Sequence, residues 1–210
     1  MNKSITQRLL LAGVVMAPLF FSVIIVQMVI REGFDITKHP ISALSLGDLG
    51  WIQSTNFIIA GILSLLLAIG LRRALVSKKA SVWVPVLTGV FGVGIILAGL
   101  FATDPAFGFP LGTPDAMPAT MSFHALLHSI GFFIAFTALI ASCFVMARRY
   151  SEQKDTAWAR FSIAIGIITP ILIILGMSAL SDLAGLCFFV GAVLVMGGLS
   201  VTAWRLLTQQ

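Results

Sequence analysis

The chain has 210 residues, of which 59% are hydrophobic and only 10% are charged, whereas a soluble domain carries about 25% charged residues. So little charge cannot cover a water-facing surface, and the mean hydropathy of +1.05 predicts a surface that faces lipid. The net charge of +5 does not indicate a nucleic-acid partner, because the basic residues occupy short segments between apolar runs instead of one soluble patch.

Six apolar runs divide the chain, at about residues 9–30, 51–71, 82–102, 121–146, 157–177 and 183–206. Each run is close to the roughly 20 residues that a helix needs to cross the hydrocarbon core, and backbone groups in lipid must bond within their own segment. We therefore expect an all-α polytopic membrane protein, a bundle of six transmembrane helices that forms a single transmembrane domain over residues 1–210. The first run is too long for a signal peptide and is expected to be retained.

The charged residues are sorted by side of the membrane. Every Lys and Arg except Arg31 and Lys38 falls on one side of the six predicted spans, whereas most acidic residues fall on the other. Because cytoplasmic loops carry the excess of Lys and Arg, both termini are expected in the cytoplasm. This pattern predicts a multi-pass protein of a bacterial or archaeal cytoplasmic (inner) membrane.

The first outer connection, about residues 31–50, is too polar to enter lipid and too rich in Leu and Ile for a loose linker. We expect it to fold back over the mouth of the bundle, with a short interfacial helix from Pro40. Arg31 could grip an anionic headgroup, since its guanidinium matches such groups well. Asp35 and Asn56 are further candidates for ligand binding at this face.

The second outer connection, about residues 103–120, is rich in Pro and Gly and predicts a series of rigid turns. We expect Asp104 to end the third helix, where a carboxylate opposes the helix dipole. It should therefore have a compensating partner, which could be a cation, a hydrogen-bond donor or a metal. The third run is dense in glycine, and small residues let helices approach closely in lipid.

Two histidines, His124 and His128, lie four residues apart at the start of the fourth run. This spacing places both imidazoles on one helix face and can present two nitrogens to one metal. His39 could supply a third nitrogen and leave an open position for water or substrate. Ser42 or Asp104 could then orient or deprotonate the bound water, as in a catalytic zinc site.

Several alternatives to this zinc site remain open. In one of them Arg31, Asp35, Asp104 and His39 pair with one another and only hold the outer loops in place. The zinc site predicts a metal-dependent hydrolase that acts on lipid, whereas its absence favours a non-catalytic bundle that binds or transports a lipid or small molecule under an outer lid. Haem is disfavoured, because ligands four apart on one helix cannot take opposite faces of the iron. Zinc is the only cofactor predicted; the expected partners are membrane lipids and, as a possibility, a second copy of the chain.

Over nearly its whole length the chain resembles a family of bacterial and archaeal membrane proteins known as the domain of unknown function number nine hundred and ninety-eight. That resemblance implies no activity. The stretches that carry it are Arg31-x-Gly33-Phe34-Asp35 with His39, Ile41-Ser42-x-Leu44-Ser45-x-Gly47, Gly50-Trp51, Asn56-Phe57, and Phe101-x-Thr103-Asp104-Pro105-x-x-Gly108-Phe109-Pro110-x-Gly112.

A looser likeness links the chain to transmembrane hydrolases that include alkaline ceramidases and adiponectin-receptor-like proteins. Those proteins hold zinc with three histidines, two of them in a His-x-x-x-His pair, near a Ser and an Asp. His124, His128, His39, Ser42 and Asp104 supply the same residue types. The chain departs from that pattern, because those proteins have seven helices with the pair on the last one, whereas here the pair opens the fourth of six.

Overall fold

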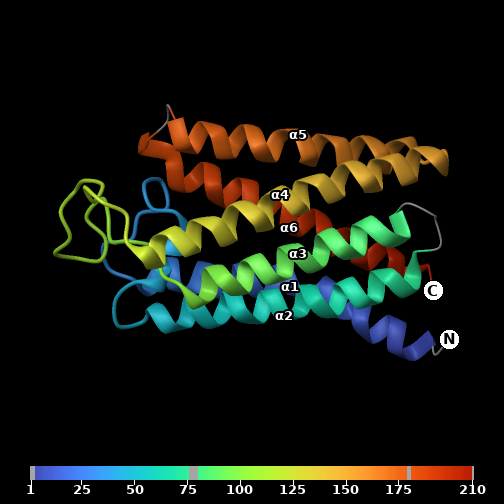
Figure 1. The fold of residues 1–210 in the computed structure, drawn as a ribbon, viewed down its shortest axis with the longest axis horizontal. Coiled ribbons are helices and arrows are strands. Elements are labelled where there is room, and N and C mark those ends of the chain that lie inside the picture. The colour runs from blue at the N-terminus through green and yellow to red at the C-terminus, as the bar shows by residue number, and fades with distance from the viewer. Residues whose placement is uncertain (1–2, 76–79, 179–180, 210) are drawn as a thin grey trace.

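The computed structural model describes residues 3–75, 80–178 and 181–209. Within these ranges six helices are long and apolar enough to cross a membrane, and no strand is formed, which confirms the expected all-α class. Figure 1 shows the helices packed lengthwise beside one another. They are α1 (Lys3–Ile30), α2 (Gly50–Ala74), α3 (Ala80–Leu100), α4 (Phe123–Glu152), α5 (Thr156–Ser178) and α6 (Ala184–Thr208).

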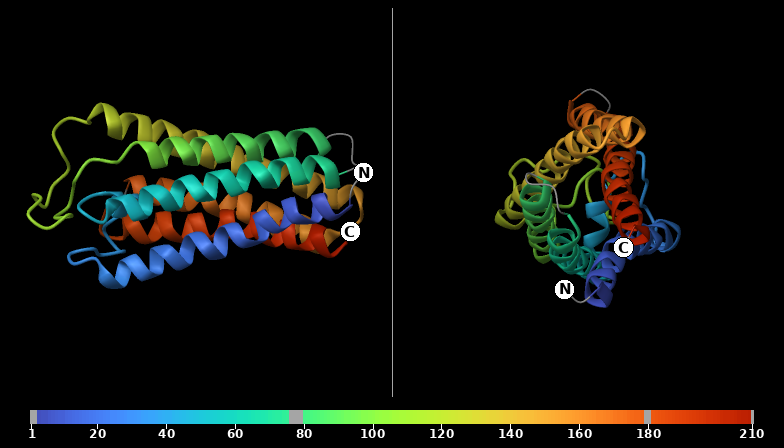
Figure 2. Two further views of the ribbon diagram at one scale, coloured as in Figure 1. Left: turned by 90° about the horizontal axis from the view of Figure 1, so that it is seen from below. Right: turned by 90° about the vertical axis from the view of Figure 1, so that its right-hand side faces the viewer.

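The helices form a ring. Each helix packs against its neighbours in sequence, and α6 closes the ring against α1, as the end-on view in Figure 2 shows. Both termini lie at the same end of the bundle (Figure 1), which we call the terminal end. The opposite end carries the connections 31–49 and 101–122, and we call it the loop end.

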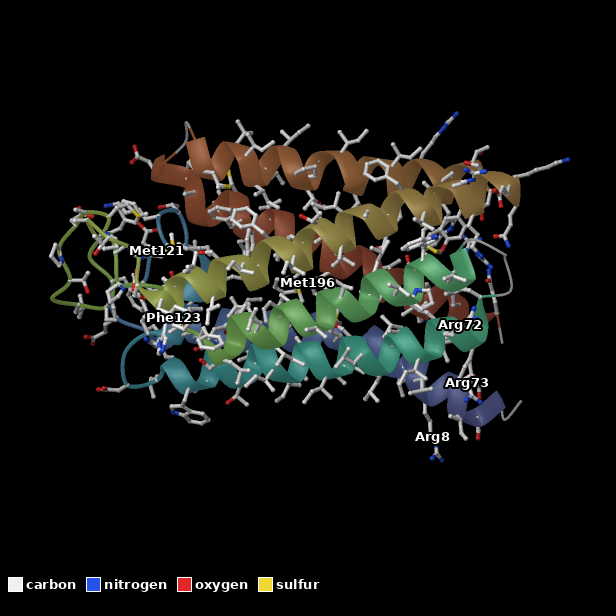
Figure 3. The ribbon with its side chains drawn as sticks, in the orientation of Figure 1. Arg8, Arg72, Arg73, Met121, Phe123 and Met196 are labelled. Atoms are coloured by element: carbon white, nitrogen blue, oxygen red, sulfur yellow. The ribbon has the colours of Figure 1, made fainter. Side chains whose placement is uncertain are left out.

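The basic residues gather at the terminal end. Figure 3 shows Arg8, Arg72 and Arg73 there, far from the loops. Helices also extend beyond the apolar runs at this end: α1 begins at Lys3 and α4 continues to Glu152. The part of a helix that extends beyond the lipid needs no apolar side chains. The length of an apolar run therefore underestimates the length of the helix that contains it. Lys78 and Lys79, two of the basic residues between the second and third apolar runs, lie outside the described residues, as do residues 179–180 between the fifth and sixth runs.

Close contact between helices is made through glycine on one side of the ring. A Cβ atom added to Gly92 of α3 would lie 2.8 Å from the carbonyl oxygen of Gly61 of α2. One added to Gly94 of α3 would lie 2.7 Å from the carbonyl oxygen of Gly131 of α4. The backbones of α2, α3 and α4 therefore touch, as the glycine density of the third run predicts.

Polar side chains tie α1 to α2 inside the bundle. Gln27 Nε2 donates to Gln53 Oε1 at 2.8 Å, and Asn56 Nδ2 donates to the Phe20 carbonyl at 3.0 Å. All three side chains are buried. A polar group away from water needs such partners, so these amides serve the helix contact.

Ser200 of α6 closes the ring against α1. Its hydroxyl donates to the Gly13 carbonyl at 2.7 Å and accepts from the Ala17 N–H at 3.2 Å. Gly13 and Ala17 are four apart, the spacing of a hydrogen-bonded pair within one helix. The hydroxyl thus bridges the backbone of α1 directly to α6.

Candidate functional site

The two connections at the loop end fold together into a cap, which we define as residues 31–49 and 101–122. A short 3₁₀ helix, η1 (Ile41–Ser45), follows Pro40, where a short helix is expected from the sequence. It contacts α1, α2 and α6 and lies within the mouth of the ring. The first connection therefore folds back over the bundle.

Arg31 holds η1 in place. Its guanidinium donates through Nη1 to the Leu44 carbonyl at 3.0 Å and through Nη2 to the Leu46 carbonyl. It also lies over the ring of Phe109, with Cζ 5.3 Å from the ring centroid. Through this cation–π contact Arg31 binds the second connection as well. The guanidinium of Arg31 is thus bonded within the cap while the residue remains partly exposed, and its grip on an anionic headgroup stays a prediction.

His39 joins the two connections and uses both of its ring nitrogens to do so. Nδ1 accepts from the Asp35 N–H at 2.9 Å, which assigns the proton to Nε2. Nε2 lies 2.8 Å from the Phe107 carbonyl and donates to it. The ring packs beside Phe34 and Phe109 and is only 3% exposed. A metal ion could use His39 only after one of these bonds broke.

Asp35 stabilises a turn and docks the cap on α6. Its Oδ1 accepts from the Thr37 N–H at 2.9 Å and from the Thr37 hydroxyl at 2.7 Å, and these bonds hold the pKa of the carboxyl below its usual range. The Thr37 carbonyl in turn accepts from the Gly185 N–H of α6 at 3.0 Å. A Cβ atom on Gly185 would lie 2.3 Å from the His39 carbonyl oxygen, so only glycine allows this close docking.

Asp104 has the compensating partner that its charge requires, and that partner is a hydrogen-bond donor. Its Oδ2 accepts from the Ser122 N–H at 2.8 Å, and Ser122 caps α4 by accepting from the Ala125 N–H at 3.1 Å. The structure corrects the expected position of Asp104, because α3 ends at Leu100. The carboxylate therefore lies near the positive N-terminal end of α4, where the dipole favours it.

A cavity of about 580 Å³ lies beneath the cap, inside the loop-end half of the ring. It runs from Met121 at the loops to Met196 near the middle of α6, and Figure 3 labels both residues. Met196 is twelve residues into α6, so the cavity reaches about 18 Å along that helix. Its walls include six aromatic rings, those of Phe20, Phe57, Phe132, Phe133, Phe136 and Phe188.

Two apolar residues of the cavity wall are also strongly exposed. Phe133 of α4 lines the cavity and is 46% exposed, and Met177 of α5 lines it and is 59% exposed. In Figure 1, α4 and α5 lie close at the terminal end and separate toward the loop end. Two neighbouring helices thus contribute strongly exposed apolar side chains to the cavity wall.

Polar side chains line the cavity at its cap end, in contrast to the apolar walls below. Four candidates from the sequence line the cavity, namely His39, Ser42, Asp104 and His128. Arg31, Asp35, Asn56 and His124 are not among the lining residues. The polar residues of the lining are Lys38, His39, Ser42, Thr103, Asp104, His128 and Ser129.

The predicted three-histidine zinc site is not assembled. His128 Nδ1 donates to the carbonyls of Ala98 and Phe101, each at 2.9 Å, and His39 is bonded within the cap. His124 is exposed, with its ring beside that of Phe101. Across residues 3–75, 80–178 and 181–209, no group of three or more His, Cys, Asp or Glu side chains is placed to hold a metal ion. The four-residue spacing places His124 and His128 on one side of α4, but it does not bring their ring nitrogens to a shared position where one metal ion could bind both.

Sequence reasoning missed Phe109 and Ser129. Phe109 is 1% exposed and contacts Phe34, His39 and Arg31, so it anchors the cap. Phe109 follows a glycine in the polar second connection, and such a position in the sequence only weakly predicts that the side chain is buried. Ser129 lines the cavity next to His128; a lone serine in an apolar helix gives no signal of this kind.

The sequence profile of a family described as "Protein of unknown function (DUF998)" matches residues 14–205. No curated protein and no solved structure matches the chain. The family's description assigns no activity, so the function has to be argued from the cavity and its cap.

Proposed function

We propose that this chain, which belongs to the DUF998 family of proteins of unknown function, binds a lipid-like amphiphile in the cavity beneath its cap. The observation that carries the proposal is one cavity with three properties. It has apolar walls, polar side chains at the cap end, and strongly exposed apolar residues in its wall.

The size and lining of the cavity suit an alkyl chain. About 580 Å³ falls within the roughly 300–1,000 Å³ of small-molecule pockets, which are mostly apolar with a few placed polar groups. Aromatic rings and the flexible methionines Met121, Met177 and Met196 supply adaptable apolar contact. A ligand with a chain and a polar head would satisfy both ends of the cavity at once.

The bilayer is the source of ligand that we propose. An amphiphile dissolved in the membrane could enter between α4 and α5, past Phe133 and Met177, without crossing water. The bias of Lys and Arg toward the terminal end supports a cytoplasmic location for that end. The loop end would then face outward, and the ligand would come from the outer leaflet of the cytoplasmic membrane.

A photolabelling experiment tests this proposal. The full chain in phospholipid nanodiscs is irradiated with a long-chain alcohol that carries a diazirine on its chain, and labelled peptides are mapped by mass spectrometry. We expect labels on the cavity-lining positions of α4 and α6. Ala192→Phe, at a cavity-lining position of α6, should abolish them, whereas the control Ala164→Phe, at an exposed position of α5, should not. Labels that are confined to exposed residues and unaffected by Ala192→Phe would contradict the proposal.

A zinc-dependent hydrolase is the competing proposal, and the geometry supports it less well. His39 has both ring nitrogens bonded to backbone groups, and His128 has one of them bonded. Stoichiometric zinc in the purified protein, lost from a folded His124→Ala/His128→Ala double variant, would favour the hydrolase over simple binding. The possible homo-oligomer stays a prediction.

A further inference from the structure

The bonding of His128 fixes what it offers to the cavity. Both partners of Nδ1 are carbonyl oxygens, at 2.9 Å, and carbonyls only accept, so Nδ1 carries the proton. In the neutral ring Nε2 is then an acceptor. Nε2 has no hydrogen-bond partner in the described part of the chain, and His128 lines the cavity while being 6% exposed. A lone pair is therefore available to a ligand.

Asp104 adds a second acceptor at the same end. Its Oδ2 takes the Ser122 N–H, and its other carboxylate oxygen has no partner among the described residues. Ser129 and Ser42 add hydroxyls, which can either donate or accept. The lining has one cationic side chain, Lys38, and it is already paired with Asp115 at 3.7 Å. Apart from the hydroxyls and the Lys38 ammonium, whose ion pair is between exposed side chains, the free polar groups of the cavity are thus acceptors, and one of them is negatively charged.

We infer that the cavity selects amphiphiles whose headgroup donates hydrogen bonds and carries no negative charge, meaning hydroxyl or ammonium headgroups, and disfavours fatty-acid anions. This inference rests on the proposed function and names its ligand class. A donor headgroup would satisfy His128 Nε2 and Asp104, whereas a carboxylate would meet a like charge and an acceptor.

The position of His128 matches such a ligand. It lies five residues after Phe123, the first residue of α4, so its Cα is about 7.5 Å below the start of that helix. A headgroup bonded to Nε2 would lie one to two helical turns beneath the cap. The chain would then extend along the aromatic walls toward Met196, whose side chain lines the deep end.

Three probes of equal chain length test the selection. Radiolabelled hexadecylamine, 1-monohexadecanoylglycerol and hexadecanoate are titrated into nanodiscs that hold the full chain, with empty nanodiscs subtracted. The pH is about 8, where histidine is ordinarily neutral. Nanodiscs are preferred to detergent, because a detergent is itself an amphiphile that would compete. We expect the amine and the glyceride to bind at least about tenfold more tightly than hexadecanoate, the ratio that one charged or well-placed hydrogen bond provides.

Two variants distinguish the contribution of the Asp104 carboxylate to headgroup binding from that of His128 Nε2. Asp104→Asn keeps an amide oxygen for the Ser122 N–H but removes the charge, so it should weaken the amine about tenfold and leave the glyceride within about twofold. His128→Phe removes the Nε2 acceptor and should weaken both. Because His128→Phe also removes the bonds to α3, its folding is checked by thermal unfolding, and Asp104→Asn stands as the independent test.

The outcomes distinguish this inference from the proposed function. Equal affinity for all three probes, lost together in Ala192→Phe, would overturn the headgroup selection and leave amphiphile binding intact. So would an amine affinity that Asp104→Asn does not change. No saturable binding of any probe above empty nanodiscs would overturn amphiphile binding itself, and the headgroup selection with it.

Discussion

The two sides of the helix ring are built differently, although their sequences are equally apolar. On the side of α2, α3 and α4, glycine lets backbone meet backbone, as at Gly94, where an added Cβ would lie 2.7 Å from the Gly131 carbonyl oxygen. On the side of α5 and α6, the contacts that glycine makes between the two helices are looser: a Cβ on Gly176 of α5 would lie 3.2 Å from the Ala184 carbonyl oxygen of α6. A Cβ on Gly191 would find its nearest atom at 3.8 Å, and one on Gly197 would find none within 4 Å.

This difference shows how a small bundle can be both rigid and hollow. Backbone contact through glycine leaves no room for a ligand and strengthens packing where lipid supplies no hydrophobic drive between helices. The cavity lies within the loop-end half of the ring, where residues of all six helices line it. The cap then docks on α6 through Gly185 and covers the open half. Close packing on one side of the ring thus coexists with a cavity at the loop end that is lined by helices of both sides.

Filling the close-packed side should give the largest effect on stability. Gly94→Ala places a methyl group against the backbone of α4, which cannot yield as a side chain can, so we expect a loss of about 1–3 kcal/mol. The matched Gly197→Ala, in open space on α6, should stay within about 1 kcal/mol of the parent. Thermal unfolding in one detergent compares them, and equal effects would refute the contrast between the two sides.

Arg31→Ala should loosen the cap with little effect on the ring below it. The variant leaves the Leu44 and Leu46 carbonyls without their charged donor, which costs about 1.5–3 kcal/mol locally. Hydrogen exchange of the Ala43 and Leu46 amides should therefore accelerate by roughly tenfold to a hundredfold. Arg31→Lys should recover only part of the protection, since an ammonium lacks the guanidinium fork. A drop in the global unfolding midpoint as large as that of Gly94→Ala would show that the cap and the ring are one cooperative unit.

Ser200→Ala should have the smallest effect of the three, at the seam where α6 meets α1. Interhelical hydrogen bonds in membranes average about 0.6 kcal/mol, so a small loss of stability is expected. Ser162→Ala is the control, because the Ser162 hydroxyl donates to the Trp158 carbonyl of its own helix. Unfolding midpoints in the same detergent should place Ser200→Ala below Ser162→Ala. The reverse order would show that the seam does not depend on this hydroxyl.

Sequence alone determined the class of the fold. Six apolar runs, the short helix after Pro40 and the close packing of the third helix all follow from local rules, because lipid forces backbone groups to bond within a segment. The need of Asp104 for a partner also followed from the helix dipole. Each of these inferences depends on residues near one another in the chain.

Only the tertiary structure decided which polar groups meet. The sequence places His39, His124 and His128 at one end of the bundle, but a metal site needs their nitrogens at one point. In the fold, His39 instead hydrogen-bonds to the Phe107 carbonyl, and His128 hydrogen-bonds to a carbonyl near the end of α3. The cavity was equally beyond the sequence, because all six helices line it and no local pattern specifies how their side chains fit together.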